Sequence, residues 1–299
     1  MPVWDDISSA ISAATGASFA IQSRAGIAGG CINAAYRIDG CGQSYFVKLN
    51  DAAKAAMFEA EAAGLSEIAR TRTLRVPHPI CQGVNAGQAW LVLEYIELNR
   101  NNASKGNAAS MRELGAGLAR MHESAAPRFG WHRDNTIGAT PQINTQNADW
   151  MTFWRDHRLG YQLRLAAANG HGGRLQKSGE RLLAGMNALL ASHQPRPSLL
   201  HGDLWGGNIG FASDGQPLVF DPAVYYGDRE ADLAMTELFG GFSTDFHAAY
   251  RDRASVDAGY AVRKTLYNLY HVLNHLNLFG GSYLAQAQNM IAQLLAEKG

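Results

Sequence analysis

The chain has 299 residues, of which 46% are hydrophobic and 17% are charged, so it holds enough apolar material for a substantial core. This composition excludes an intrinsically disordered protein. Lysine plus arginine and aspartate plus glutamate each number 26, and this balance argues against nucleic acid or an anionic membrane as a partner.

Neither a targeting signal nor a membrane span is visible in the sequence. The first residues lack the basic and apolar regions of a secretory signal, and no stretch approaches the length of a membrane span. Three cysteines, Cys31, Cys41 and Cys81, suit a reducing compartment and cannot form a complete intrachain disulfide framework. We therefore expect a cytoplasmic protein that does not cross a membrane.

Strand patterns dominate roughly the first hundred residues, and helical patterns dominate the rest. The elements expected first are a helix that ends at Gly16, strands at 17–24, 34–39 and 44–49, a helix at 54–69 and a hairpin at 80–95. A polar connector, NRNNASKGN, then precedes the elements of the second half. These are helices at 108–123 and 147–166 and short strands at 199–201, 208–211 and 217–221.

This order predicts an α+β protein with two lobes. The smaller lobe, residues 1–97, would contain an antiparallel sheet and one main helix. The larger lobe, residues 98–299, would be mostly helical. The polar connector marks the boundary, and a cleft between the lobes is where a ligand would bind.

The strongest chemical signal is HGDLWGGN at 201–208, followed by Asp221 at the end of the apolar run Leu218-Val219-Phe220. Phosphoryl transfer requires a carboxylate that faces the acceptor hydroxyl and oxygen ligands that hold magnesium against nucleotide phosphates. Asp203 followed by Asn208 supplies both kinds of group from one loop. Asp221 then completes the order found in protein kinases, and this predicts Asp203 as the base and Asn208 and Asp221 as metal ligands.

An alternative explanation must be weighed, because Asp, Asn and Gly also dominate ordinary turns. Taken alone, Asp203 and Asn208 would fit that explanation. The presence of Asp221 in register, with hydrophobic strands on both sides, favours the catalytic interpretation.

A kinase of this type also needs a strand lysine that holds phosphates and a helix glutamate that fixes the lysine. Lys48 interrupts the apolar strand 44–49, and the next helix offers Glu59 and Glu61. Glu61 lies beside the apolar stripe of that helix, whereas Glu59 lies further round. We therefore expect Lys48 to pair with Glu61, although all three side chains would also suit a solvated surface.

Two further segments are candidates for nucleotide binding. Gly29 and Gly30 lie between two strands, where glycine allows backbone amides to approach phosphate closely, although such hairpins are common. The strand 91–96 runs into the connector, where a hinge would expose backbone groups. The Glu94 carbonyl and the Ile96 amide are the candidates for adenine.

Several sequence blocks make the chain resemble the fructosamine kinase (ketosamine-3-kinase) family, within the aminoglycoside-phosphotransferase-like kinases. The blocks are GGCIN at 29–33, FVKLN at 46–50, MFEAE at 57–61, DNTIG at 134–138, PQIN at 141–144, HRLGYQL at 157–163, HGDLWGGN at 201–208 and DPAVYYGDREADLAM at 221–235. They span most of the chain. The resemblance implies ATP and Mg²⁺ as cofactors and the phosphorylation of ketosamines, which are amines glycated by glucose or ribose.

The resemblance implies the same roles for Lys48, Glu61, Asp203, Asn208 and Asp221. It implies a small glycated amine as substrate, with glycated lysine on proteins as an alternative, and it does not choose among ribulosamine, erythrulosamine and fructosamine. A kinase of another small amine or alcohol, such as an aminoglycoside, choline or a sugar, shares the motif. A nucleotide-binding pseudokinase scaffold would be expected to lack one of the catalytic residues.

Other residues around the motif are candidates for substrate binding or for packing. Trp205 could stack on the sugar or serve as a packing wedge. Trp150, Phe153 and Trp154 fall on one helix and favour core packing. By the resemblance alone, His157 and Arg158 would line the acceptor pocket.

Asp232 and His201 are expected to support the site rather than to react. Asp232 would lie in the first turn of a helix, and in kinase-like folds the matching residue braces the catalytic loop; His201 would order the same loop. Cys31 is a candidate redox residue in the glycine loop, and it could equally be a small residue tolerated there. The chain would then be a monomer or a dimer linked through Cys31.

Overall fold

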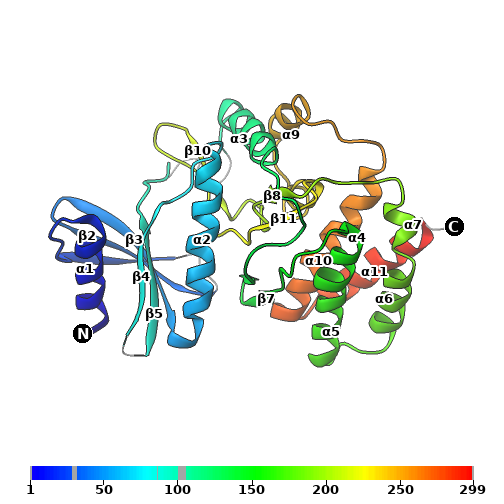
Figure 1. Cartoon of the computed structure of the whole chain (residues 1–299), viewed down its shortest axis with the longest axis horizontal. Helices are drawn as coiled ribbons and strands as arrows, with labels where there is room; N and C mark the ends of the chain where they lie inside the picture. Colours follow the sequence, from blue (N-terminus) through cyan, green and yellow to red (C-terminus); the bar gives the residue numbers. More distant parts are fainter. Residues whose placement is uncertain (1, 29–31, 86, 100–105, 298–299) are drawn as a thin grey trace.

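The computed structural model describes residues 2–28, 32–85, 87–99 and 106–297, and two parts of the molecule lie side by side in Figure 1. The N-terminal part is built on a five-stranded antiparallel sheet with the strand order β1-β2-β3-β5-β4. Its elements are α1 (Pro2–Thr15), β1 (Ser23–Ile27), β2 (Ala34–Gly40), β3 (Gln43–Asp51), a 3₁₀ turn (Ala52–Lys54), α2 (Ala55–Thr71), β4 (Pro79–Asn85) and β5 (Gln88–Glu94).

A helix covers each face of this sheet, with α1 on one side and α2 on the other (Figure 1). Successive side chains of a strand point to opposite faces. Val47 of β3 therefore packs in a cluster with Ile7 and Ile11 of α1, while Leu91 of β5 packs in the cluster that contains Phe58 of α2. The same alternation directs Lys48 toward α2.

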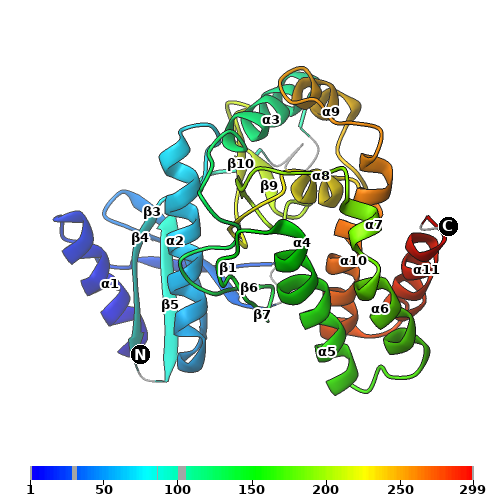
Figure 2. The same ribbon diagram turned by 45° about the vertical axis from the view of Figure 1, so that its right-hand side comes forward.

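The C-terminal part is mostly helical, and it adds three two-stranded ladders. Its helices are α3 (Ala108–Met121), α4 (Trp150–Phe153), a π-helix (Trp154–Leu159), α5 (Gly160–Ala168), α6 (Arg174–Ala184), α7 (Asn187–Leu190), α8 (Glu230–Thr236), α9 (Thr244–Arg251), α10 (Tyr260–Phe279) and α11 (Tyr283–Ala296). Its strands are β6 (Asn135–Ile137), β7 (Thr140–Gln142), β8 (Ser198–Leu200), β9 (Ile209–Phe211), β10 (Pro217–Val219) and β11 (Tyr225–Gly227). Helix α10 runs through this half, with α11 and α6 on the side away from the sheet (Figure 2).

Two sequence-based predictions of elements are wrong in part. The strand expected at 17–24 lies at Ser23–Ile27, because Phe19 and the half-buried Ile21 pack into the core around α1 while β1 pairs as an exposed edge. The helix expected from 147 begins at Trp150, where the Asp149 carboxylate caps it by accepting from Thr152 N at 2.7 Å.

That helix also contains the π-helical segment Trp154–Leu159, which periodicity does not reveal. The core packing expected for Trp150, Phe153 and Trp154 is confirmed, since all three are at most 4% exposed. The strands expected near 199–201, 208–211 and 217–221 are present as β8, β9 and β10.

Helix α2 is fixed against the segment that follows Asp221. A methyl group placed on Gly64 would lie 3.1 Å from Val224 Cγ2, so the glycine permits this close approach. Tyr226 donates its hydroxyl to Glu67 of α2 at 2.7 Å. The helix that carries Glu61 is therefore held by the same segment that carries Asp221.

Within the described ranges, no helix is both long and apolar enough to cross a bilayer.

Candidate active site

The candidate catalytic loop, residues 201–208, joins β8 to β9, and Asn208 closes it on itself. The Asn208 side-chain amide donates to the Asp203 carbonyl at 2.8 Å and to Asp203 Oδ2 at 3.0 Å. Burial raises the pKa of Asp203 to about 7, although the bond from Asn208 opposes this shift. The loop therefore presents a carboxylate with the proton affinity expected of a base near neutral pH.

His201 orders the start of this loop through both ring nitrogens. Nε2 lies 3.1 Å from the Phe220 carbonyl, which can only accept, while Nδ1 accepts from Asp203 N at 3.3 Å. These partners require the neutral tautomer with the proton on Nε2. Burial lowers the pKa of His201, which agrees with that assignment. The His201 ring therefore links the start of the loop to the residue before Asp221.

Asp232, in the first turn of α8, holds the start of the loop through its backbone amides. Its carboxylate accepts from His201 N at 2.7 Å and from Gly202 N at 2.8 Å, and His122 Nε2 lies 3.1 Å away. Burial acts to raise the pKa of Asp232, but the bonds from His122 and the backbone outweigh it and the pKa is lowered. A buried carboxylate therefore remains charged and bound to two consecutive loop amides.

Gly202 is required at its position for a steric reason. Its φ is +82°, and a Cβ there would lie 2.1 Å from the Ala223 carbonyl oxygen. The loop can therefore lie directly on the segment that follows Asp221.

Lys48, Glu61 and Asp221 meet across the boundary between the sheet and the C-terminal half. The Lys48 ammonium lies 2.6 Å from Glu61 Oε1 and 2.5 Å from Asp221 Oδ1. Burial disfavours the charged ammonium, but the two carboxylates outweigh that effect and raise the pKa of Lys48. Glu59 instead pairs with Arg133 at 3.1 Å, so the pairing of Lys48 with Glu61 is the one the structure shows.

The donor set at Asp221 and Asn208 fits a hard divalent cation. Asp221 has a φ of +56°, an uncommon conformation for a residue other than glycine, and its side chain is 49% exposed. Phe220 N donates to the Asn208 carbonyl at 3.1 Å, which brings the two ligand positions to the same end of the β9-β10 hairpin. Both hydrogen bonds from the Asn208 side chain to Asp203 use Nδ2, and Oδ1 is the atom that suits a metal ion.

Trp205 follows Asp203 by two residues and is 38% exposed. A Cβ at Gly207 would lie 2.3 Å from the indole, so the ring lies across that glycine. The indole edge meets the Phe239 ring at a centroid distance of 6.3 Å. The exposed ring is available to a ligand, and it is not buried as a packing wedge would be.

A buried polar network, missed by sequence reasoning, supports the segment after Asp221. Asn135 donates to the Val224 carbonyl at 2.8 Å, and Gln142 donates to the Ala223 carbonyl at 2.9 Å. Asn144 joins the network by donating to Asn135 Oδ1 at 2.9 Å. The blocks DNTIG and PQIN contain these residues, and the density of amide side chains in them was the available signal.

Arg158 belongs to this network, and the prediction that it lines the acceptor pocket is wrong for this conformation. The side chain is 0% exposed, donates to Asn144 Oδ1 at 2.8 Å and lies 4.1 Å from the centroid of the Tyr225 ring. It therefore acts as a core residue. His157, the neighbouring candidate, is half-buried beside Phe153 and keeps part of its surface in solvent.

Of the remaining nucleotide candidates, the structure describes Glu94 and Ile96. Glu94 ends β5, where its backbone amide donates to the His78 carbonyl at 2.8 Å, and Ile96 follows in a half-buried stretch. Gly29, Gly30 and Cys31 lie outside the described residues. Cys41 and Cys81 are free thiols.

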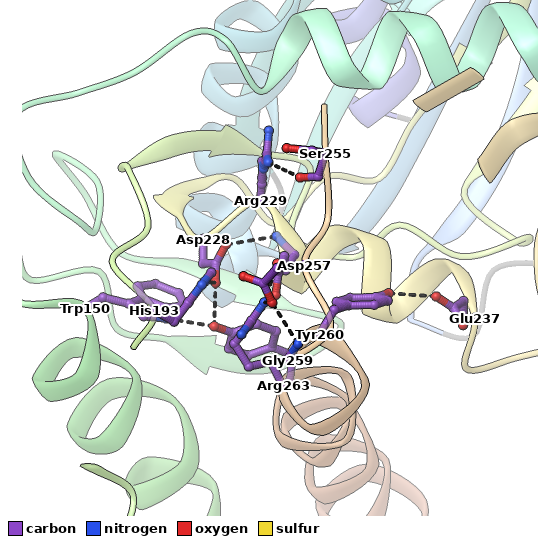
Figure 3. A network of polar contacts seen from close by, with 12 residues as sticks. Trp150, His193, Asp228, Arg229, Glu237, Ser255, Asp257, Gly259, Tyr260 and Arg263 are labelled. Carbon is purple, nitrogen blue, oxygen red and sulfur yellow. Dashed lines mark hydrogen bonds and ion pairs between the residues drawn. The ribbon is translucent and has the colours of Figure 1, made fainter. Parts of the chain in front are cut away.

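A second polar network surrounds the start of α8 and holds it in place (Figure 3). Asp228 accepts from His193 Nε2 at 2.6 Å, and Arg263 binds Asp257 at 2.7 Å and both oxygens of Glu230 at 2.6 and 2.9 Å. His193, Asp228 and Glu230 lie close enough to suggest a metal site, yet the Arg263 guanidinium already neutralises Glu230. The network therefore holds the turn from which Asp232 projects.

Comparisons with known proteins agree with this architecture. The sequence matches the family model for fructosamine kinases over residues 3–297. A probable ketoamine kinase of Synechocystis is 48% identical over 98% of this chain and 97% of its own length, and the chloroplastic protein-ribulosamine 3-kinase of Arabidopsis thaliana is 43% identical over 90% and 81%.

Solved structures give the same result for the fold. A fructosamine-3-kinase candidate from Haemophilus somnus superposes with a TM-score of 0.89 at 30% identity, covering 98% of this chain and 97% of that one. The aminoglycoside phosphotransferase APH(4)-Ia superposes with a TM-score of 0.60 at 14% identity, covering 97% and 98%, and supports the fold alone. The chain has a two-lobed protein-kinase-like fold and belongs to the fructosamine kinase family.

Proposed function

We propose that this kinase transfers a phosphoryl group from ATP to a sugar hydroxyl of ketosamines, the adducts of sugars with amines. The observation that carries the proposal is the meeting of four side chains at one site: Asp203 and Asn208 in one loop, with Asp221 bound to Lys48 beside them. A carboxylate base, an amide and a carboxylate as oxygen ligands, and a buried cation for phosphate are the groups that phosphoryl transfer requires.

Each side chain has a role that follows from its environment. Asp203 would accept the proton of the attacking hydroxyl, because burial raises its pKa to about 7. Asn208 and Asp221 would hold Mg²⁺, which neutralises phosphate charge when bound. Lys48 would bind the phosphates and would exchange its contact with Asp221 for them, while Glu61 keeps it in place.

The adenine would lie at the hinge, against the Glu94 carbonyl and the Ile96 amide, with Gly29 and Gly30 over the phosphates. The lobe boundary at 97/98 follows from the same proposal. The exposed Trp205 indole would stack on the sugar, because it stands two residues after the base. A cytoplasmic location remains the expectation from the few cysteines.

Among ketosamines, ribulosamines are the first acceptors to test, because the Arabidopsis relative bears that name. An aminoglycoside acceptor has less support, since the aminoglycoside phosphotransferase is only 14% identical to this chain. A pseudokinase scaffold is disfavoured because Lys48, Asp203, Asn208 and Asp221 are all present.

Magnesium-dependent release of ADP tests the proposal, with ribulosamine, erythrulosamine and fructosamine adducts of one amine as acceptors. Asp203→Asn is the control variant, and Asp214→Asn, in an exposed turn, is its matched partner. We expect turnover that depends on the ketosamine and is lost only in Asp203→Asn. Turnover of an aminoglycoside or choline, with none of any ketosamine, would contradict the proposal.

A further inference from the structure

The β9-β10 hairpin, which has the two proposed metal ligands at one end, pairs on both outer edges with segments from the N-terminal side of the chain. On the β9 edge, Asn99 N, in the connector after β5, donates to the Phe211 carbonyl at 2.8 Å. On the β10 edge, Val219 N donates to the Arg75 carbonyl at 3.0 Å, and Arg75 pairs in parallel with Leu218. The hairpin is therefore held between the segment that precedes β4 and the segment that follows β5.

The Arg75 side chain adds two contacts to this backbone pairing. Its guanidinium donates from Nη1 to Gln216 Oε1 and from Nη2 to Glu94 Oε1, each at 3.2 Å. The other Glu94 carboxylate oxygen accepts from His78 N at 3.3 Å, and Glu94 N donates to the His78 carbonyl at 2.8 Å. Because a guanidinium presents its donors in a rigid fork, this one side chain can hold the end of β5 and the start of β10 at a fixed separation.

An ordinary surface ion pair is the alternative explanation for Arg75 and Glu94, whose side chains are 31% and 32% exposed. Such pairs contribute little to folding stability. The location of Arg75 distinguishes it from them, because its contacts lie on three places: β10 through its carbonyl, Gln216 before β10 through Nη1, and the end of β5 through Nη2. The side chain therefore joins the sheet of the small lobe to the hairpin of the large lobe.

Both ends of this bridge are places that the proposed function uses. Glu94 ends β5, where the adenine would bind, and β10 leads into Asp221, which would hold Mg²⁺ against the phosphates. A nucleotide must reach both places at once. It binds more tightly when they are already at the separation that it requires, because less ordering is then needed on binding.

We propose that Arg75 is a positioning residue for the nucleotide, which sets the end of β5 against β10 before ATP binds. The inference rests on the proposed function for the places of the adenine and of Mg²⁺. Asp203, the proposed base, lies in the loop before β9 and not on β10. Loss of the Arg75 side chain should therefore weaken nucleotide binding and leave acceptor binding largely unchanged.

The test measures the Kd of Mg·ADP by isothermal titration calorimetry with the full chain, beside KM for ATP and KM for a ribulosamine. Arg75→Ala removes both side-chain contacts and keeps the backbone bond to Val219, while Arg75→Lys keeps the charge but not the fork. Lys264→Ala is the matched control. It breaks an ion pair of similar exposure, 36% for Lys264 and 26% for Glu237, inside the C-terminal half.

We expect Arg75→Ala to raise the Kd of Mg·ADP and KM for ATP about fivefold, the effect of losing a charged pair at this exposure, with less than about twofold change in KM for the ribulosamine. Arg75→Lys should lie between wild type and Arg75→Ala, and Lys264→Ala should stay within about twofold of wild type. Adding Glu94→Gln to Arg75→Ala should weaken binding no further, because both substitutions remove the same contact.

Three results would overturn the inference while the proposed function stands: a Kd for Arg75→Ala within about twofold of wild type, an equal rise in KM for the ribulosamine or in Kd for Lys264→Ala, or additive effects of Arg75→Ala and Glu94→Gln. A wild-type enzyme that shows these effects on Mg·ADP but turns over no ribulosamine would support the inference and overturn the ketosamine assignment. A wild-type enzyme that binds no Mg·ADP would overturn both.

Discussion

Replacing Asp232 with asparagine keeps the size of the side chain but removes the charge that holds the catalytic loop. The carboxylate accepts two consecutive backbone amides at 2.7 and 2.8 Å, both buried. An asparagine offers one acceptor oxygen, so one loop amide would face an amide nitrogen and lose its partner. A charge-assisted hydrogen bond contributes about 1.5–3 kcal/mol, and an unsatisfied buried donor costs a further 1–3 kcal/mol, so we expect a loss of about 3–4 kcal/mol.

Urea unfolding measures this loss, and kcat measures its effect on the loop. We expect kcat to fall about 10- to 100-fold, because an ångström of displacement at the base has effects of that size. Asp214→Asn is the control, since Asp214 also accepts a backbone amide, Gln216 N at 2.9 Å, but in an exposed turn. An Asp232→Asn variant with wild-type kcat and less than about 1 kcal/mol of destabilisation would refute the reasoning.

The same variant should behave differently from wild type in acid. The pKa of Asp232 in the folded protein lies below its ordinary value of 3.8, so the unfolded chain takes up the proton first as the pH falls. The stabilisation by this carboxylate is therefore complete above about pH 4 and is lost as the pH falls through the folded pKa. The difference in unfolding free energy between wild type and Asp232→Asn should shrink over that window.

Three further predictions concern other parts of the molecule. Glu61→Gln should raise KM for ATP about tenfold through loss of a buried pair, while Glu59→Gln, in an exposed pair, should stay within about twofold; equal effects would contradict the assignment. Because burial raises the pKa of Asp203 to about 7, kcat/KM for the acceptor should fall as the pH drops below about 7, and a flat profile would exclude Asp203 as the titrating base. Burial lowers the pKa of His271 to about 3, so the unfolded chain binds a proton first as the pH falls, and the stability of the folded protein decreases below about pH 6.5. His271→Phe should remove up to about 1.4 kcal/mol per pH unit from this dependence, as measured by urea unfolding at several pH values. An unchanged pH dependence in the variant would contradict this prediction.

The meeting of the candidate site residues was predictable because it depends on residues close to one another in the sequence. Asp203 and Asn208 lie in one loop, and Asp221 lies at the end of the hairpin that follows it, so spacing alone brings them near one another. The pairing of Lys48 with Glu61 followed from the alternation of strand faces and the apolar stripe of α2. Both arguments need only the local geometry of one element and its neighbour.

The buried contacts that support the site were not predictable from such arguments. Arg158 and Asn144 look like surface or pocket residues in sequence, and only the tertiary fold brings them together beneath Tyr225. The first strand was displaced because Phe19 contributes to the core without sheet pairing. The π-helical turn in the helix after Asp149 likewise could not be recognised from the spacing of apolar residues.

The most direct test of the central claim is to identify the product formed from a ribulosamine, ATP and Mg²⁺. Mass spectrometry and phosphorus NMR of the acceptor should show one phosphoryl group on the sugar and none on the amine carrier, and Asp203→Asn should form no such product. Hydrolysis of ATP to free phosphate without transfer, or a phosphoryl group on the carrier, would contradict the account.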